Sequence, residues 1–495
     1  MPLYRACQRV STHGVKMRKT KIVATLGPAT DDPAVLRSLI EAGLDVARFN
    51  FSHGDYESHK KRIDLFRKVC AETGITVAML ADTKGPEIRL DTFRDGKAEL
   101  TTGSNFTLTT SKIEGDSTRV GISYPGLPGE VVPGTRILLD DGLIDLSVES
   151  ATATDIVTRV MNGGSISDRK SLNVPGVKLS IPYISAKDRS DLRFFIENGF
   201  DLIAASFARS AEDISEMREE LRRVDSNYKI RIIAKIENAE GVKNAESILS
   251  VADGLMVARG DLGVEVAFEE LPIIQKDLIK RALRNGKSAI TATQMLESMI
   301  HNPRPTRAET SDVANAIFDG TGSIMLSGET AVGSYPVEAL SAMAKIAERI
   351  ERDIDYRLRF NRGEYKPETS ITNAISHATV TTAHDLQAAA ILTVTLSGFT
   401  ALNIAKFRPL CPIIACTPDP VVQRQLKLVW GVIPVLTSTE TDTNDLFDHA
   451  IKTALDGGYI SNGDLVVLTA GVPVGHTGNT NMLKVHVVGE KVFVS

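Results

Sequence analysis

The feature that most constrains the fold is a short apolar run followed by an amphipathic segment, a pattern that occurs eight times along the chain. Apolar runs of this length, bounded by polar residues and separated by segments of helical periodicity, are typical of buried parallel strands joined by helices. The eight runs lie at residues 21–26, 44–49, 77–80, 201–205, 232–236, 254–257, 288–291 and 323–326. Because polar residues follow nearly every run, we expect a closed (β/α)8 TIM barrel whose strand ends share one face, in preference to an open doubly wound sheet.

Two other regions interrupt or follow this pattern. Residues 87–182 contain β-type runs such as NFTLTT and RILLDDGLIDLSV, with Gly and Pro between them and no segment of helical period. They predict a mostly β domain inserted after the third strand, because a rigid scaffold tolerates insertions at its loops. The last part of the chain alternates helices and strands and predicts a smaller α/β domain. The expected organisation is an N-terminal extension (1–17), a barrel (18–86 and 183–356), the inserted domain (87–182) and a C-terminal domain with a candidate effector site (357–495).

Composition excludes several classes of protein. The formal net charge of −5 argues against a nucleic-acid-binding protein that works through bulk electrostatic attraction. No apolar run approaches the roughly 20 residues of a membrane-spanning helix, and the first residues lack the apolar stretch of a secretion signal. The four cysteines form no CxxC pair, which favours a reducing compartment. We therefore expect a cytoplasmic protein that binds neither nucleic acid nor membranes.

Charged residues gather where two successive predicted strands end. Lys235 and Glu237 end the fifth run, and Arg259 and Asp261 follow the sixth. Ligands bind at the carboxyl ends of barrel strands, and two carboxylates from neighbouring strands suit one Mg²⁺, which completes its shell with water and phosphate oxygens. The two cations would then face an anion that shares the metal, and Gly260 would let that anion approach the backbone. The alternative is that each acidic residue only caps a helix.

A second polar group follows the second and third runs. Arg48, Asn50 and Ser52 alternate along one strand end, so their side chains point the same way. With Asp82 and Thr83 from the next strand they form an oxygen-rich group. This group fits either a monovalent cation or an ordinary hydrogen-bond network.

Two further segments carry weaker signals. Thr293 follows the seventh strand, where a threonine is usually structural but can serve catalysis. In the last domain, hydroxyls and a glycine lie between a strand and a helix, and they suit either a phosphate-binding turn or a helix cap. The residues of this turn are Thr395, Ser397, Gly398 and Thr400.

The segments that contain these residues resemble the motifs of pyruvate kinase, in that family's order, from Lys19 to the end of the chain. The motifs are RFNFSHG, DTKGPEIR, DDGL, SFAR, AKIEN, VARGDLGVE, ATQMLESM, RPTRAETSDVANA and MLSGETA. The resemblance implies transfer of the phosphoryl group of phosphoenolpyruvate to ADP, followed by protonation of the enolate to give pyruvate and ATP, the final step of glycolysis. It also implies Mg²⁺ (or Mn²⁺) and K⁺ as cofactors and a homotetramer.

The resemblance further implies a role for each residue. Lys235 would stabilise the phosphoryl group in transit, Arg48 would contact it, and Thr293 would organise proton delivery to the enolate carbon. The inserted domain would act as a lid that excludes water, and Glu87 is the residue type associated with K⁺ dependence. The implied sets are Lys235, Thr293 and Arg48 for catalysis; Arg48, Lys235, Gly260, Asp261 and Thr293 for substrate; Asn50, His53 and Arg89 for nucleotide; Glu237 and Asp261 for Mg²⁺; and Asn50, Ser52, Asp82 and Thr83 for K⁺.

The C-terminal turn departs from part of that family. Leu396 and Phe399 stand where relatives that respond to fructose bisphosphate often have basic residues, so a phosphorylated effector with a single phosphate fits equally well, as does none. Two rival functions fit the same residues. One is a barrel lyase or aldolase that uses Mg²⁺ to stabilise an enolate, which would have little use for the lid. The other is a catalytically inactive scaffold, against which the complete set of catalytic residues argues.

Overall fold

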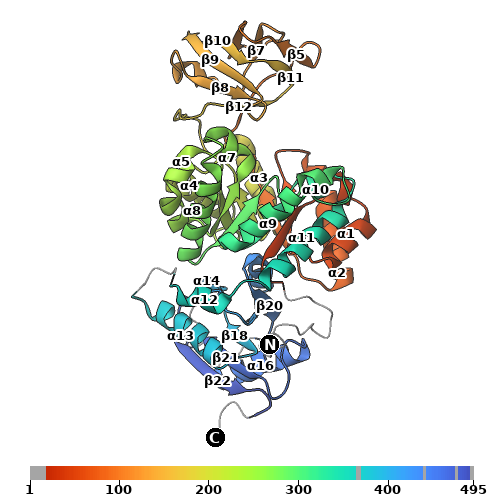
Figure 1. The fold of residues 1–495 in the computed structure, drawn as a ribbon, viewed down its shortest axis with the longest axis vertical. Helices are drawn as coiled ribbons and strands as arrows, with labels where there is room; N and C mark the ends of the chain where they lie inside the picture. The colour runs from red at the N-terminus through yellow and green to blue at the C-terminus, as the bar shows by residue number, and fades with distance from the viewer. Residues whose placement is uncertain (1–17, 364–368, 439–441, 474–477, 491–495) are drawn as a thin grey trace.

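The computed structural model describes residues 18–363, 369–438, 442–473 and 478–490, so the predicted N-terminal extension, 1–17, lies outside it. Three parts follow one another along the long axis of the molecule (Figure 1). The inserted β-rich domain, which we call the lid, lies at one end, the barrel lies in the middle, and the C-terminal domain lies at the other end. None of the helices in these described ranges is both long enough and apolar enough to span a membrane.

The middle part is a closed barrel of eight parallel strands, which confirms the predicted fold. Every strand is fully or almost fully buried, because side chains on one face fill the barrel interior and those on the other pack against the helices. Around the barrel the strands follow the order β1 (Lys21–Thr25), β17 (Ser323–Leu326), β16 (Ser288–Ala292), β15 (Gly254–Ala258), β14 (Arg231–Ile236), β13 (Leu202–Ala205), β3 (Ala78–Asp82) and β2 (Val46–Asn50).

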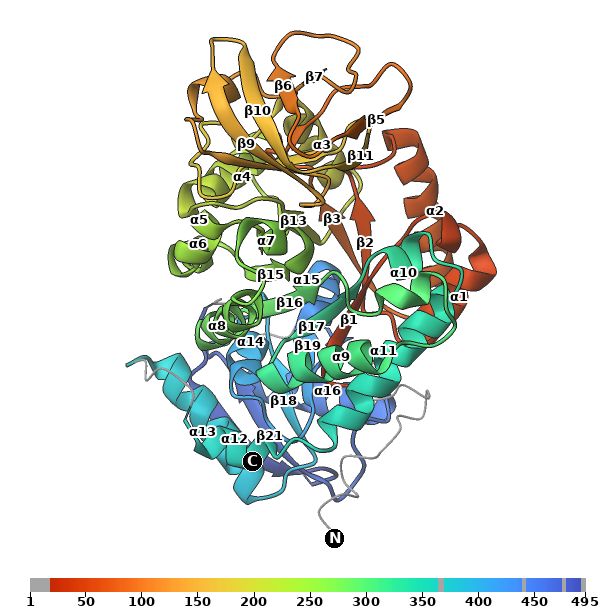
Figure 2. The same cartoon turned by 45° about the horizontal axis from the view of Figure 1, so that its top comes forward.

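Helices that bury one apolar stripe surround the strands (Figure 2). Their ends carry ordinary capping residues: Asp55 accepts a hydrogen bond from the backbone of Ser58 at the start of α2, and Gly74, with φ of 68°, ends it. The helices are α1 (Pro33–Glu41), α2 (Tyr56–Thr73), α3 (Ala186–Glu197), α4 (Ala211–Val224), α5 (Ala239–Lys243), α6 (Ala245–Val251), α7 (Arg259–Glu265), α8 (Leu271–Arg284), α9 (Arg307–Asp319), α10 (Gly328–Ala331) and α11 (Pro336–Glu351).

The lid has its own hydrophobic core and contains two sheets and one 3-10 turn, Leu127–Gly129, as the sequence pattern predicted. It leaves the barrel after β3 and returns before α3, so two connections join it to the carboxyl ends of the barrel strands. Its larger sheet has the order β4 (Ile88–Arg89), β12 (Ser171–Asn173), β8 (Arg136–Leu139), β9 (Ile144–Ala151), β10 (Asp155–Asn162), β6 (Asn105–Thr109) and β7 (Arg119–Gly121), and the smaller sheet pairs β11 (Gly164–Ser167) with β5 (Lys97–Leu100).

The C-terminal domain is the predicted α/β unit, with helices on both faces of one sheet. The sheet has the order β20 (Val432–Leu436), β19 (Ile413–Thr417), β18 (Ala390–Val394), β21 (Leu465–Ala470) and β22 (Met482–Val487), of which only β22 is antiparallel to its neighbour. The helices are α12 (Tyr356–Asn361), α13 (Ile371–Asp385), α14 (Phe399–Lys406), α15 (Pro420–Gln425) and α16 (Thr443–Asp456).

The C-terminal domain closes the amino end of the barrel. Leu428, in the short 3-10 turn after α15, belongs to the same hydrophobic cluster as the side chains that fill the barrel interior. Its carbonyl oxygen accepts a hydrogen bond of 3.2 Å from Ser323 Oγ at the start of β17. Because this end is blocked, the carboxyl ends of the strands, which face the lid, are the open face of the barrel.

Candidate active site

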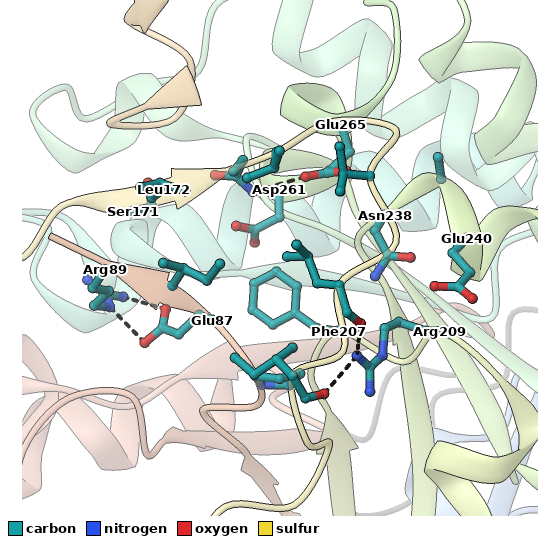
Figure 3. Close-up of a pocket in the computed structure, with 18 of the residues that line it drawn as sticks. Glu87, Arg89, Ser171, Leu172, Phe207, Arg209, Asn238, Glu240, Asp261 and Glu265 are labelled. Atoms are coloured by element: carbon teal, nitrogen blue, oxygen red, sulfur yellow. Dashed lines mark hydrogen bonds and ion pairs between the residues drawn. The ribbon is translucent and has the colours of Figure 1, made fainter. Parts of the chain in front are cut away.

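A pocket of about 730 Å³ lies between the lid and the carboxyl ends of the barrel strands (Figure 3). The lid contributes Arg89 and Asp141, the connection from β3 contributes Glu87, and the barrel contributes Asp261 and Glu265 from α7. Its lining is therefore rich in charged groups of both signs. A site of this shape and composition suits a charged ligand enclosed between two domains.

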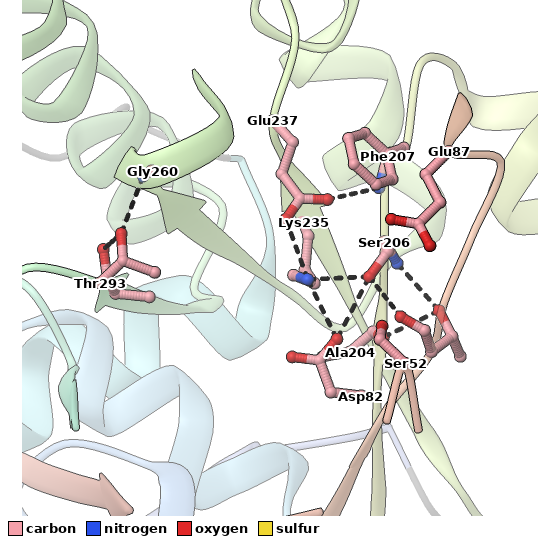
Figure 4. Close-up of polar contacts among 12 residues, drawn as sticks. Ser52, Asp82, Glu87, Ala204, Ser206, Phe207, Lys235, Glu237, Gly260 and Thr293 are labelled. Carbon is pink, nitrogen blue, oxygen red and sulfur yellow. Dashed lines mark hydrogen bonds and ion pairs between the residues drawn. The ribbon is translucent and has the colours of Figure 1, made fainter. Parts of the chain in front are cut away.

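Lys235 lies at the end of β14, at the centre of a buried charge network (Figure 4). Its ammonium lies 3.0 Å from Asp82 Oδ1 and 2.9 Å from Glu237 Oε1, and it donates a hydrogen bond of 2.8 Å to Ser206 Oγ. Burial alone would lower the pKa of Lys235, but the carboxylates of Asp82 and Glu237 outweigh it and raise that pKa. The side chain is therefore a fixed positive charge at neutral pH.

Glu237 and Asp261 supply the two neighbouring carboxylates that the sequence predicted. Burial raises the pKa of Glu237 to about 7; Lys235 opposes this shift, and Asp261 adds to it. Burial likewise raises the pKa of Asp261, again against Lys235, and Asp141 adds to that shift. The negative charge of the pair is thus only partly compensated by the surrounding protein.

The same pair fits a divalent cation. Glu237 Oε2 accepts a hydrogen bond of 2.7 Å from the backbone of Phe207, whereas the buried Oε1 has an ion pair with Lys235 but no hydrogen bond. Within the described residues, no group of three or more His, Cys, Asp and Glu side chains is arranged as a metal site. Two neighbouring carboxylates match Mg²⁺, which commonly takes one or two carboxylates and completes its shell with water and substrate oxygens.

Thr293 follows β16 and faces the start of α7. Its hydroxyl accepts a hydrogen bond of 2.8 Å from the backbone of Gly260 and donates one of 2.6 Å to the carbonyl of Ala292. Thr293 and Gln294 both have left-handed backbone conformations, with φ of 68° and 53°. Such conformations in residues other than glycine are strained and concentrate at functional sites.

Arg259 does not face the pocket, so our interpretation of it as an anion-facing cation is wrong. Its guanidinium is buried and turns toward the loop after β16, where Nη2 lies 2.6 Å from the carbonyl oxygen of Thr293. Nη1 forms an ion pair of 2.7 Å with Asp312. Sequence spacing does not report the direction of a long side chain, which explains the error.

The predicted monovalent-cation residues do lie together at the ends of β2 and β3, where Asn50 and Asp82 are register partners. Their polar atoms are also bonded to the protein. Arg48 Nε donates to Asp82 Oδ2 at 2.7 Å, Asn50 Oδ1 accepts from the backbone of Ser52 at 3.1 Å, and Thr83 Oγ1 accepts from Ser206 at 3.1 Å. The cations Arg48 and Lys235 lower the pKa of Asp82 against its burial.

Of the three residues predicted to bind the nucleotide, the structure places two at the pocket. His53 and Arg89 line the pocket, whereas Asn50 is not among its lining residues. Arg89 reaches Glu87 through two hydrogen bonds of 2.7 Å, so these two side chains form one planar pair at the edge of the pocket.

Sequence reasoning assigned no role to the SFAR segment, residues 206–209, although it links the lid to the charge network. Ser206 Oγ donates to the carbonyl of Thr83 at 2.6 Å on the outgoing connection of the lid. Arg209 Nη1 donates to the carbonyl of Ile181 at 3.0 Å on the returning connection. The position of SFAR directly after a strand was the available signal, because that is where site residues of a barrel lie.

The C-terminal turn has the contacts of a structural turn. Thr395 Oγ1 accepts a hydrogen bond of 2.9 Å from the backbone of Gly398, which has φ of 82° and precedes α14. The hydroxyl of Thr400 is buried and bonded to Thr480, and the carbonyl of Ser397 accepts from Arg231 of the barrel. Two of the three predicted phosphate-binding hydroxyls are therefore used within the domain.

Comparison with known proteins agrees with this geometry. A model of the pyruvate kinase barrel domain matches residues 17–340, and a model of the pyruvate kinase alpha/beta domain matches residues 373–486. The chain belongs to the pyruvate kinase family. It is accordingly a phosphotransferase, which moves the phosphoryl group of phosphoenolpyruvate to ADP and forms pyruvate and ATP.

Similar pyruvate kinases occur in several bacteria. The chain is 52% identical over 475 residues to the pyruvate kinase of Geobacillus stearothermophilus, 49% over 479 residues to that of Sporosarcina psychrophila, and 49% over 478 residues to that of Staphylococcus saprophyticus. Each match covers 96% of this chain and 81% of the relative. Membership in the pyruvate kinase family sets aside the lyase and scaffold alternatives.

Proposed function

We propose that this chain transfers the phosphoryl group at the carboxyl ends of β14 and β15, with Lys235, Glu237 and Asp261 at the centre and Mg²⁺ or Mn²⁺ as cofactor. The observation that carries this proposal is the carboxylate pair of buried Glu237 and half-buried Asp261, whose pKa values are raised beside an ammonium. A bound divalent cation would supply the positive charge that this pair lacks and would hold substrate oxygens beside Lys235.

The protein's own contribution is positioning and charge. Phosphoryl transfer passes through a loose transition state in which charge spreads over the phosphoryl oxygens, so fixed cations lower its free energy. Lys235 and Arg48 are both held by Asp82, at 3.0 and 2.7 Å, which keeps the two cations on one side of the site. They would neutralise the phosphoryl group without having to reorganise during transfer.

Thr293, Gly260 and Asp261 would contact the substrate where the enolate carbon lies. The Thr293 hydroxyl is both donor and acceptor, and it is bonded to the backbone of Gly260 at the start of α7. This supports a role in delivering a proton, directly or through water, to the enolate formed by phosphoryl transfer.

The pocket beneath the lid would hold ADP, with His53 and Arg89 on the nucleotide side. The group formed by Asn50, Ser52, Asp82 and Thr83 would hold K⁺, with small rearrangements of its present hydrogen bonds. Movement of the lid over the barrel would exclude water from the reacting phosphoryl group.

An activity assay across ADP, Mg²⁺, K⁺ and Na⁺ tests these assignments. Pyruvate formation should require ADP and a divalent cation, and K⁺ should support faster turnover than Na⁺. Equal pyruvate formation without ADP would contradict the proposed transfer. Replacement of K⁺ by Na⁺ without loss would contradict only the monovalent-cation assignment.

We also propose a homotetramer in the cytoplasm and, at the turn of Thr395, Ser397, Gly398 and Thr400, an effector site for a ligand with one phosphate. The position of that turn against Arg231, at the foot of the strand that carries Lys235, supports a regulatory role. Light scattering would test the tetramer, and activation or inhibition by sugar monophosphates or nucleotides would test the effector site.

A further inference from the structure

The turn that presents Thr293 is strained, so some part of the protein must hold it. Thr293 and Gln294 are successive residues with side chains, and both have the left-handed conformation that normally only glycine adopts readily. Strained backbone of this kind persists only where its surroundings fix it.

Arg259 makes the contacts that fix this turn. Its Nε and Nη2 donate to the carbonyl oxygen of Thr293 at 3.2 and 2.6 Å, and Nη2 also donates to that of Gln294 at 3.1 Å. The remaining nitrogen, Nη1, pairs with Asp312 at 2.7 Å. A guanidinium can make all these bonds at once because its donors form a rigid planar fork.

The residue next to Arg259 holds the other side of the same threonine. The backbone N–H of Gly260 donates to the Thr293 hydroxyl at 2.8 Å. Two consecutive residues at the start of α7 therefore fix both the carbonyl and the hydroxyl of Thr293. Every nitrogen of the Arg259 guanidinium is engaged by the loop after β16 or by Asp312.

We propose that Arg259 is a positioning residue, which acts on proton delivery by fixing the turn that carries Thr293. This inference rests on the proposed role of Thr293 and adds to it the group that sets its geometry. Small displacements of a reacting group lower the rate strongly even when the group itself is intact. The expected defect is therefore in turnover and not in substrate affinity.

The variant Arg259→Lys tests the proposal, because a lysine keeps the positive charge beside Asp312 but lacks the planar fork of donors that bonds both carbonyl groups and Asp312 at once. The matched control is Arg218→Lys on α4. Arg218 donates to the carbonyl of Val251 at 3.0 and 2.9 Å and pairs with Asp253 at 2.6 Å, near the opposite end of the barrel. Both variants lose the same kind of contact, and only one of them lies beside Thr293.

We expect Arg259→Lys to lower kcat by about 10- to 100-fold with less than about a threefold change in KM for phosphoenolpyruvate. The solvent deuterium isotope effect on kcat should increase, because proton delivery becomes slower relative to the other steps. Arg218→Lys should lose comparable thermal stability while its kcat stays within about twofold. Asp312→Asn, which leaves the carbonyl contacts in place, should lower kcat less than Arg259→Lys does.

Two results would overturn the proposal. One is an equal loss of kcat in Arg259→Lys and Arg218→Lys, which would make the contact merely structural. The other is a rise in KM for phosphoenolpyruvate at unchanged kcat, which would place Arg259 on the substrate. Thr293→Val separates this inference from the proposed function. Near-normal turnover in Thr293→Val would reject the role of Thr293 itself. Loss of turnover in Thr293→Val together with near-normal turnover in Arg259→Lys would reject only the role of Arg259.

Discussion

Buried charge clusters occur at both ends of the barrel, and their differences distinguish a functional site from a structural one. The upper cluster, at the carboxyl ends of the strands, consists of Arg48, Lys235, Asp82, Glu237 and Asp261. The lower cluster, at the amino ends, consists of Arg18, Lys21, Asp45, Glu351 and Lys427. The upper cluster has one more carboxylate than cations, and the lower cluster has one more cation than carboxylates.

The lower cluster satisfies its charges within the protein. Asp45 pairs with Arg18 and Lys427 and accepts from the backbone of Ile22; these contacts outweigh burial and lower its pKa to about 2. Lys21 donates to the carbonyl of Val432 at 2.7 Å in the C-terminal domain, although its burial lowers its pKa to about 8. These contacts join the barrel to the C-terminal domain.

The upper cluster is left incomplete. The pKa of Glu237 is raised, one of its oxygens has no hydrogen bond, and Asp261 lines a pocket. A cluster that lacks positive charge and opens on a cavity supports the proposed binding of a cation with the substrate, whereas a cluster with a lowered carboxyl pKa stabilises the fold.

Replacement of Lys235 by methionine should give the largest effect of all. We expect kcat to fall by about 10³-fold or more, because the fixed charge that we propose to lie beside the phosphoryl group is lost. The fold should persist at lower stability, because methionine fills a similar volume but leaves the buried carboxylates of Asp82 and Glu237 without this partner. Steady-state kinetics with circular dichroism would check this, and turnover near the original level would contradict the role of the upper cluster.

Replacement of Asp45 by asparagine should have the opposite profile. Loss of this carboxylate leaves Arg18 and Lys21 buried without their partner, so the free energy of unfolding should fall by about 3–5 kcal/mol. Turnover of the folded enzyme should not change, because the cluster lies at the blocked end of the barrel. Denaturant unfolding and kcat per folded molecule would measure both; a selective loss of kcat would mean that the lower cluster also serves catalysis.

The two clusters should also respond to pH in opposite directions. The folded-state pKa of Glu237, about 7, lies above the ordinary value of 4.5, so the metal-free fold loses stability as pH rises between these values. The pKa of Asp45 is lowered, so its stabilisation is present above about pH 4 and is lost toward pH 2. Only the first effect falls in the neutral range.

A divalent cation should prevent the loss of stability at higher pH by pairing with ionised Glu237. Mg²⁺ should therefore raise the Tm by roughly 3–6 °C more at pH 8 than at pH 6, where the proton competes with the metal. Glu237→Gln should abolish the difference between the two pH values. An equal Mg²⁺ effect at both pH values in the unchanged protein would show that the metal binds elsewhere.

Much of the fold and part of the site could be predicted because both follow from periodicity. Repeated apolar runs specify the strands, and polar residues after them specify the carboxyl face, so Lys235, Glu237, Asp261 and Thr293 were found on it. The sequence does not show whether a long side chain points into the site or toward a neighbouring loop. The reach of Arg259 to the backbone of Thr293 and that of Arg209 to the lid connection therefore could not be predicted.

Contacts between domains were also outside the reach of sequence patterns. Leu428 is an ordinary apolar residue of a short turn, yet it closes the barrel interior from another domain. The lower cluster escaped prediction for the same reason, because Lys427 meets Asp45 only after the C-terminal domain has docked. Periodicity shows which face of a helix or strand is buried, but not which distant element packs against that face.

Replacement of Lys427 by methionine should give the smallest effect and is the sharpest test of the independence of the two ends. Its ammonium lies 3.3 Å from Asp45 but also lowers the pKa of Lys21 by repulsion, so its removal takes away one attraction and one repulsion together. The free energy of unfolding should therefore change by about 1 kcal/mol or less. Since Arg18 still pairs with Asp45, kcat and KM should stay within about twofold. A larger change in kcat at unchanged stability would show that docking of the C-terminal domain is felt at Lys235 through the barrel strands, and the two clusters would then have to be treated as one coupled system.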